Sequence, residues 1–176
     1  MNSKLKTHHS KLVFIALGSN LGDSRMILLA ALAELQVFST APVLKSSLWQ
    51  TSPVDCPPGS RKFLNAVAAL VPPAGETPES LLEKLQALEK KFGRRPKKLL
   101  NEPRPLDLDL IAFGMETRSS ARLTLPHPRA FARRFVLQPL CEIAPALVLP
   151  GQTRTVAQLL AGLDDSESCE KVSAAG

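Results

Sequence analysis

The sequence feature that most constrains the fold is an alternation of leucine and aspartate in the segment LDLDLIAF, residues 106–113. Successive side chains of a strand point to opposite faces, so the leucines fit a buried face while Asp107 and Asp109 share the other. Two neighbouring carboxylates repel each other and need a cation between or beside them. Such oxygen ligands favour Mg²⁺. The alternatives are two solvated acids or ion pairs with the basic loops on either side.

Hydrophobic periodicity and cap residues predict the other elements. The other expected strands are 12–17, 43–50 and 63–71, and the expected helices are 24–36 and 78–92. Ser24 and Thr77 are expected to cap the two helices, and Gly93 to end the second. The order strand, helix, strand, strand, helix, strand predicts an α+β, ferredoxin-like βαββαβ sandwich, a mostly antiparallel sheet with helices packed on one face. C-terminal additions follow, with helices near 133–140 and 156–163.

Length and composition favour one intracellular globular domain. The 176 residues support a single domain over 12–163, with polar, flexible tails at 1–11 and 164–176. No apolar run approaches the ~20 residues of a membrane span, and the basic N-terminus lacks a signal-peptide cleavage site. The three cysteines are widely spaced, which predicts reduced thiols in a cytoplasmic protein.

The net charge of +6 is concentrated in the middle of the chain. Residues 90–104 hold seven basic residues and one acid, and residues 118–134 hold five arginines, one histidine and no acid. This distribution predicts a phosphate-bearing partner, either a nucleotide or a nucleic acid, with a solvated basic face as the alternative. Neither glycine-rich phosphate-binding motif is present, so a triphosphate would be held by side chains and metal.

The chain resembles the 6-hydroxymethyl-7,8-dihydropterin pyrophosphokinase family of folate biosynthesis from about residue 12 to residue 163. The segments that carry the resemblance are ALGSNLGD, SSLWQTSPV, FLNAVAAL, Gly93-Arg94, PRPLDLDLIAFG, LTLPHPR and PLCEIAPAL. The pattern P-R-x-L-D-L-D-L followed by L-x-L-P-H-P is highly specific. The resemblance implies the ferredoxin-like fold and transfer of the pyrophosphoryl group of ATP to the pterin hydroxymethyl oxygen, with release of AMP.

The resemblance also implies a set of site residues. The catalytic residues would be Arg94, Arg104, Asp107 and Asp109, with two Mg²⁺ ions held by the two aspartates. The pterin would contact Thr51, Ser52, Val54, Phe63, Asn65 and Phe135, with the two phenylalanines on either side of its ring. ATP would contact Gln86, Glu89, Arg104, Leu110, Arg122, Thr124, His127 and Arg133. The partners would be ATP and 6-hydroxymethyl-7,8-dihydropterin, bound by a monomer without nucleic acid or membrane.

One loop departs from the family pattern. Pro96 and Leu100 stand where the family commonly has arginines, and Asn101 stands where it has an aromatic residue. Arg95, Lys97 and Lys98 are the candidates to replace the arginines, although lysine is a poorer bidentate ligand than arginine.

Two other functions are compatible with parts of the pattern. A different Asp-x-Asp nucleotidyl or phosphoryl transferase would share the metal site but not the pocket at Thr51 and Asn65. A basic nucleic-acid-binding module would need exposed stacking aromatics on its sheet. The chain has no tyrosine, and Phe63 and Phe135 lie far apart in the sequence.

Overall fold

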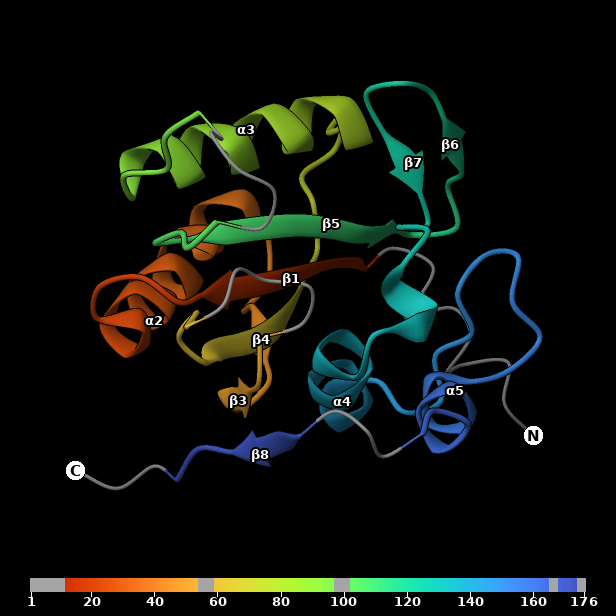
Figure 1. The fold of residues 1–176 in the computed structure, drawn as a ribbon. Coiled ribbons are helices and arrows are strands. Elements are labelled where there is room, and N and C mark those ends of the chain that lie inside the picture. The colour runs from red at the N-terminus through yellow and green to blue at the C-terminus, as the bar shows by residue number, and fades with distance from the viewer. Residues whose placement is uncertain (1–11, 54–58, 97–101, 165–167, 174–176) are drawn as a thin grey trace.

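A six-stranded sheet forms the centre of the molecule in the computed structural model, which describes residues 12–53, 59–96, 102–164 and 168–173 (Figure 1). All of its strand pairs are antiparallel, along the path β5-β1-β4-β3-β8 with β2 also paired to β4. The strands are β1 (Val13–Ser19), β2 (Leu44–Lys45), β3 (Trp49–Thr51), β4 (Phe63–Leu70), β5 (Asp107–Phe113) and β8 (Cys169–Lys171). A separate hairpin pairs β6 (Arg118–Ser119) with β7 (Thr124–Leu125).

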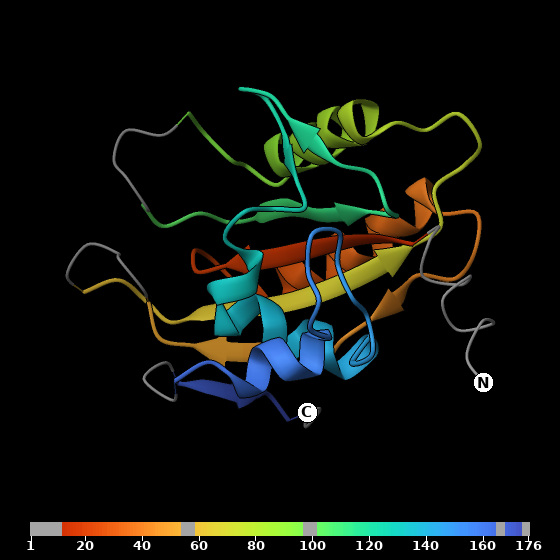
Figure 2. The ribbon, with the colours of Figure 1, turned by 90° about the vertical axis from the view of Figure 1, so that its right-hand side faces the viewer.

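Helices cover both faces of the sheet. They are α2 (Ser24–Glu34), α3 (Pro78–Lys91), α4 (Arg134–Ile143) and α5 (Val156–Ala161), with short 3-10 turns at Leu35–Phe38 and Ala130–Ala132. Apolar residues of α2 and α3 pack in one core cluster, and those of α4 and α5 pack in a second. Figure 2 shows α4 and α5 in front of the sheet and α2 behind it. Neighbouring residues such as Ile15 and Ala16 enter different clusters, because side chains alternate along β1.

The predicted ferredoxin-like fold is confirmed. With β2 and β3 taken as the two halves of the second strand, the path through the sheet runs fourth, first, third, second. The two helices of the βαββαβ unit, α2 and α3, lie on one face as expected. The C-terminal additions α4 and α5 cover the other face and so complete a three-layer sandwich.

Two local predictions are wrong. The expected strand 43–50 is interrupted between β2 and β3, because the Ser46 hydroxyl accepts a hydrogen bond from the Val67 backbone N–H at 3.0 Å, which replaces a backbone partner. The first helix is capped by Asp23, whose carboxylate accepts from the Met26 backbone N–H at 3.1 Å, rather than by Ser24. The cap predicted at Thr77 is present.

The C-terminal segment is also more ordered than the sequence suggests. A flexible tail is predicted over 164–176, but Cys169–Lys171 forms β8 and pairs with β3. The sequence signal is weak because a three-residue strand shows almost no periodicity. The tail predicted at 1–11 lies outside the described residues. Among the residues that the structure describes, no helix combines the length and apolar character needed to cross a membrane.

Candidate active site

Strand ends from distant parts of the chain meet at one end of the sheet. Gly18 of β1 lies opposite Asp107 of β5 and Asn65 of β4. At the same end, Thr51 closes β3 opposite Phe63, which begins β4. Residues directly opposite one another share a face of the sheet, as do residues two apart on one strand. The predicted residues gathered on this face are therefore Thr51, Phe63, Asn65, Asp107 and Asp109.

The predicted pterin residues Thr51 and Asn65 are joined directly. The Asn65 Nδ2 donates a hydrogen bond to the Thr51 Oγ1 at 2.8 Å, and both residues are buried. The absence of a side chain at Gly18 leaves space for the Asn65 amide, because a Cβ at that position would lie 3.3 Å from the Asn65 Oδ1. An oriented amide beside a hydroxyl suits the hydrogen-bonding edge of a flat polar ring. Sequence reasoning did not single out Gly18.

The other predicted pterin residues have different positions. Phe63 and Phe135 are half-buried, and Phe135 packs against the core cluster on the α4 side of the sheet. The guanidinium carbon of Arg133 lies 5.3 Å from the centre of the Phe135 ring, in cation–π contact. Ser52 is exposed, and its hydroxyl is hydrogen-bonded to that of Ser168 at 2.7 Å. Val54 lies outside the described residues.

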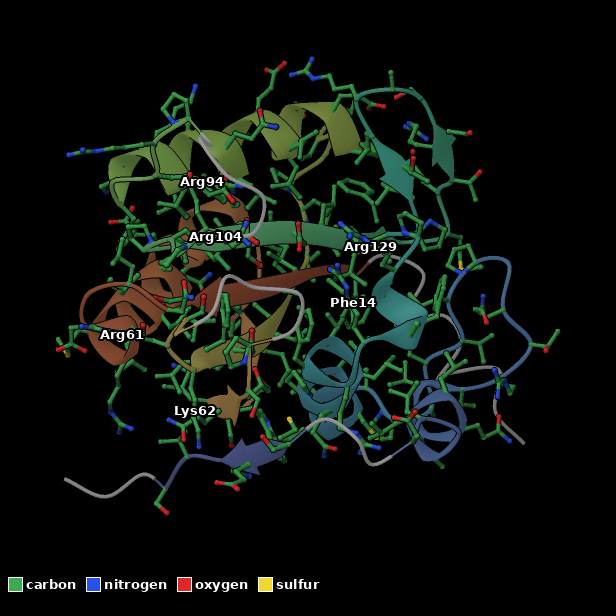
Figure 3. All side chains as sticks on the ribbon, in the orientation of Figure 1. Phe14, Arg61, Lys62, Arg94, Arg104 and Arg129 are labelled. Atoms are coloured by element: carbon green, nitrogen blue, oxygen red, sulfur yellow. The ribbon has the colours of Figure 1, made fainter. Side chains whose placement is uncertain are left out.

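The predicted catalytic residues form one cluster of charges at the start of β5. Arg94 and Arg104 approach the Asp107 carboxylate to 2.8 Å and 3.3 Å. Figure 3 shows both arginines beside the start of β5. Glu89 of α3 pairs with the same Arg94 and accepts a hydrogen bond from the Leu108 backbone N–H at 2.7 Å. Glu89 therefore ties Arg94 to the outer edge of β5.

Burial disfavours the charged forms of two acids in this cluster, Glu89 and Asp109. Burial raises the pKa of Asp109, and the negative charge of Asp107 raises it further. Burial raises the pKa of Glu89 to about 7, although the Leu108 N–H and Arg94 favour its charged form. Burial also lowers the pKa of His127, against the attraction of Asp109. An additional positive charge beside Asp109 would stabilise the ionised form of its carboxyl group.

The two aspartates fit Mg²⁺ better than a metal enclosed by protein ligands. Among the described residues, no group of three or more His, Cys, Asp or Glu side chains is arranged to hold a metal ion. Mg²⁺ is commonly held by one or two carboxylates, with waters and substrate phosphates as the remaining ligands. Asp107 and Asp109, two residues apart on one face of β5, supply that donor set.

A cavity of about 270 Å³ lies between α3, β5 and the β6–β7 hairpin. Four of the eight predicted ATP residues line it together with Asp109, namely Leu110, Arg122, Thr124 and His127. Arg122 is paired with Glu83 of α3 at 2.8 Å. The hairpin is also fastened to α3 by Arg118, which is 2.6 Å from Glu79. Polar side chains of the hairpin and Asp109, one of the two candidate metal ligands, thus line the same cavity.

The other four predicted ATP residues, Gln86, Glu89, Arg104 and Arg133, are not among the residues that line this cavity. Gln86 is exposed on α3, whereas Glu89 is buried.

His127, in the wall of the cavity, is held in place by its backbone N–H, which donates a hydrogen bond to the Ile111 carbonyl at 2.8 Å. Its Nδ1 accepts from the Arg129 backbone N–H at 3.3 Å. These contacts fix the direction of the imidazole.

A second cavity, of about 400 Å³, is lined by the described parts of the basic loop, including Arg94, Arg95, Pro96 and Arg104. The candidate replacements Lys97 and Lys98, and the departures Leu100 and Asn101, lie outside the described residues. Arg95 is exposed. This second cavity is therefore lined both by Arg94 and Arg104 of the charge cluster and by the described part of the loop that departs from the family pattern.

Asn20 is a site residue that sequence reasoning missed. Its Oδ1 accepts from the Arg104 backbone N–H at 2.9 Å, and its own backbone N–H donates to the Arg104 carbonyl at 3.2 Å. The Asn20 Nδ2 is buried and has no hydrogen-bond partner among the described residues. The turn Gly18-Ser19-Asn20 after a buried strand was the available signal. Asn20 fixes the backbone that presents Arg104 to Asp107.

Comparison with solved structures supports the fold. The wild-type HPPK-DHPS of Plasmodium falciparum with pteroate superposes with a TM-score of 0.66 over 85% of this chain, at 12% sequence identity. The chain spans 44% of that solved chain. At this level of identity the likeness concerns the fold alone.

Sequence comparison assigns the family. The model of 7,8-dihydro-6-hydroxymethylpterin-pyrophosphokinase (HPPK) matches residues 14–145. The 2-amino-4-hydroxy-6-hydroxymethyldihydropteridine pyrophosphokinase of Synechocystis sp. is 40% identical over 151 residues, covering 85% of this chain and 75% of the relative. The enzyme of that name from Pseudomonas aeruginosa is 41% identical over 150 residues, covering 85% and 90%. The chain belongs to the 7,8-dihydro-6-hydroxymethylpterin-pyrophosphokinase family.

Proposed function

We propose that this protein transfers the pyrophosphoryl group of ATP to the hydroxymethyl oxygen of 6-hydroxymethyl-7,8-dihydropterin and releases AMP, a step of folate biosynthesis. One observation carries the proposal. Asp107 and Asp109 share a face and an end of the sheet with the Thr51–Asn65 pair, and Asp109 also lines the cavity beside α3. Polar groups suited to the edge of a flat ring and a cavity suited to a nucleotide therefore lie on either side of the two carboxylates.

The reaction requires positioning and charge neutralisation more than covalent participation by the protein. A bond forms between the hydroxymethyl oxygen and the β-phosphorus of ATP, and the hydroxyl proton is released to water. The bond from that phosphorus to the bridging oxygen of the α-phosphate breaks, and AMP leaves with this oxygen. Thr51 and Asn65 would orient the pterin edge, while Phe63 and Phe135 would hold its faces. The acceptor oxygen would then lie toward Asp107 and Asp109.

Asp107 and Asp109 would hold two Mg²⁺ ions, which when bound supply positive charge to the triphosphate and the attacking oxygen. The guanidinium groups of Arg94 and Arg104 would stabilise negative charge that develops on the transferred group. Both guanidinium groups lie beside Asp107, one of the two proposed metal ligands, which supports this role. Arg122, Thr124 and His127 would bind the nucleotide in the cavity that they line.

The test is an AMP assay with the full chain, ATP, Mg²⁺ and 6-hydroxymethyl-7,8-dihydropterin. AMP should form in step with pterin pyrophosphate, and omission of the pterin or chelation of Mg²⁺ should stop it. A folded, metal-supplied protein that releases no AMP contradicts the proposal. Transfer of a nucleotidyl group with release of pyrophosphate would instead support the alternative Asp-x-Asp transferase. We also expect a cytoplasmic monomer, which size-exclusion chromatography with light scattering and cell fractionation would test.

A further inference from the structure

The C-terminal strand β8 lies beyond the region that matches the family model. That match ends at residue 145, whereas β8 is formed by Cys169–Lys171. The strand pairs with the outer edge of β3, so that Thr51 lies opposite Cys169 and Trp49 opposite Lys171. The Val172 backbone N–H extends the pairing by donating to the Leu48 carbonyl at 2.9 Å. A segment outside the family match thus covers the strand that ends in Thr51.

Side chains secure both ends of this pairing. Near the pterin pocket, the Ser168 and Ser52 hydroxyls are hydrogen-bonded at 2.7 Å. At the other end, the Lys171 Nζ pairs with the Glu142 carboxylate of α4 at 2.9 Å. The same Lys171 Nζ lies 6.0 Å from the centre of the Trp49 ring. β8 is therefore attached to β3 through its backbone and to α4 through a side chain.

Glu142 connects β8 to the segment before Thr51. Its carboxylate accepts from the Ser47 backbone N–H at 3.0 Å, the Ser47 hydroxyl at 2.7 Å and the Trp49 Nε1 at 3.1 Å. The two oxygens thus bind Ser47, Trp49 and Lys171 together. This contact network ties α4 to the N-terminal part of β3 and to β8.

Without β8, β3 would be a three-residue edge strand paired only with β4. Short edge strands with unpaired backbone groups open easily, and elements with few contacts sample local unfolding. The residue at the end of this strand, Thr51, receives the hydrogen bond from Asn65. Loss of β8 would therefore loosen Thr51, which accepts the hydrogen bond from Asn65. It would leave the carboxylates on β5 in place.

We infer that β8 is a positioning element of the pterin pocket: it holds β3 so that Thr51 and Ser52 are preformed for the ring. The inference rests on the proposed function, because the proposed function names the pterin as the substrate whose binding β8 would assist. Ordering a strand on ligand binding costs conformational entropy, which a strand already held in place avoids. The effect should fall on pterin affinity and spare ATP affinity, because the nucleotide cavity lies at the opposite edge of the sheet.

The test compares the full chain with a chain that lacks residues 168–176, by calorimetric titration with the pterin in the presence of a non-hydrolysable ATP analogue and Mg²⁺. The dissociation constant for the pterin should rise roughly 10-fold, which corresponds to about 1.4 kcal/mol. The dissociation constant for the ATP analogue should stay within a factor of two. Trp49 is the only tryptophan of the chain and lies against β8, so its emission should shift to the red on truncation.

Point variants make the test independent of the truncation. Ser168→Ala and Lys171→Met should each raise the pterin dissociation constant by a few-fold. The control is Glu170→Gln on the same strand, which should leave the constant unchanged because the Glu170 side chain contacts no partner among the residues that the structure describes. Wild-type pterin affinity in the truncated chain, or equal losses for pterin and nucleotide, overturns the inference. A full-length protein that binds neither ligand would contradict the proposed function instead, so the two failures are distinguishable.

Discussion

The guanidinium of Arg94 lies 2.8 Å from the Asp107 carboxylate, so one candidate metal ligand is paired with a positive charge of the protein itself. Arg104 adds a second contact to the same carboxylate at 3.3 Å. Asp109 differs, because burial and the neighbouring Asp107 both raise its pKa. Two aspartates of one strand therefore have unequal roles in stability, although both are expected to be essential for activity.

Asp109→Asn should abolish AMP release and at the same time stabilise the ligand-free protein. The substitution removes a proposed Mg²⁺ ligand, so turnover should fall by at least about 10²–10³-fold. It also removes a buried charge whose ionisation is unfavourable, so Tm in chelator should rise by a few degrees, equivalent to about 1 kcal/mol. AMP assays and thermal unfolding with EDTA measure the two effects.

The matched control is Asp107→Asn. It should lose comparable activity but gain no stability, because Arg94 and Arg104 lose a charged partner. Addition of MgATP should raise Tm of the wild type more than that of either variant. Near-normal turnover in either variant is incompatible with the two-metal assignment.

Thr51→Val should weaken pterin binding selectively. The valine keeps the size and β-branching of threonine but removes the acceptor of the Asn65 amide. A neutral hydrogen bond contributes about 1 kcal/mol, and the amide loses its orientation as well, so KM for the pterin should rise about 10-fold. KM for ATP should hardly change in steady-state assays. Thr40→Val, whose hydroxyl contacts the Val71 carbonyl beyond the far end of β4, is the control and should leave both constants unaltered.

Arg122→Gln should raise KM for ATP several-fold without a change in KM for the pterin. Its ion pair with Glu83 is exposed, and exposed pairs contribute little, so Arg122 can leave Glu83 for a phosphate at small cost. Glu83→Gln should therefore leave KM for ATP the same or lower it. The exposed Arg154, which lies outside the cavity lining, provides the control variant Arg154→Gln. An equal rise of both KM values in Arg122→Gln would argue against a nucleotide role for this cavity.

The network around Glu142 predicts a specific pH dependence of stability. Burial would raise the pKa of Glu142, but hydrogen bonds from Lys171, Ser47 and Trp49 outweigh it and lower the pKa to about 2. Because the pKa is lower in the folded state than the ordinary 4.5, this stabilisation is complete above about pH 4.5. It is lost as pH falls from there toward 2.

Glu142→Gln measures this contribution. The variant should be less stable than the wild type at pH 7, by about 1 kcal/mol because the group is partly exposed and screened by solvent. The difference should shrink as the pH is lowered from 4.5 to 2.5, which urea titrations at several pH values would show. A stability difference that stays constant over this range would exclude the lowered pKa as its source.

Local patterns were sufficient to predict the main elements and the acidic strand. The alternation in 106–113 predicted the strand, and Leu106, Leu108 and Leu110 are indeed buried while Asp107 and Asp109 share the opposite face. The Thr77 cap and Gly93 predicted the limits of α3, since capping is decided within one turn of the chain. The order of elements then restricted the topology to very few possibilities.

The sequence by itself determined the elements, their order and the chemical types of the site residues, because periodicity, caps and motifs depend on near neighbours. Only the tertiary structure decided that Asn65 meets Thr51, that Glu89 is buried behind Arg94, and that β8 closes the edge of β3. These relationships depend on strand register and on contacts between segments far apart in the chain. Register is set by the pairing partners and the shared core, and a short strand such as β8 has too little sequence pattern to reveal its partner.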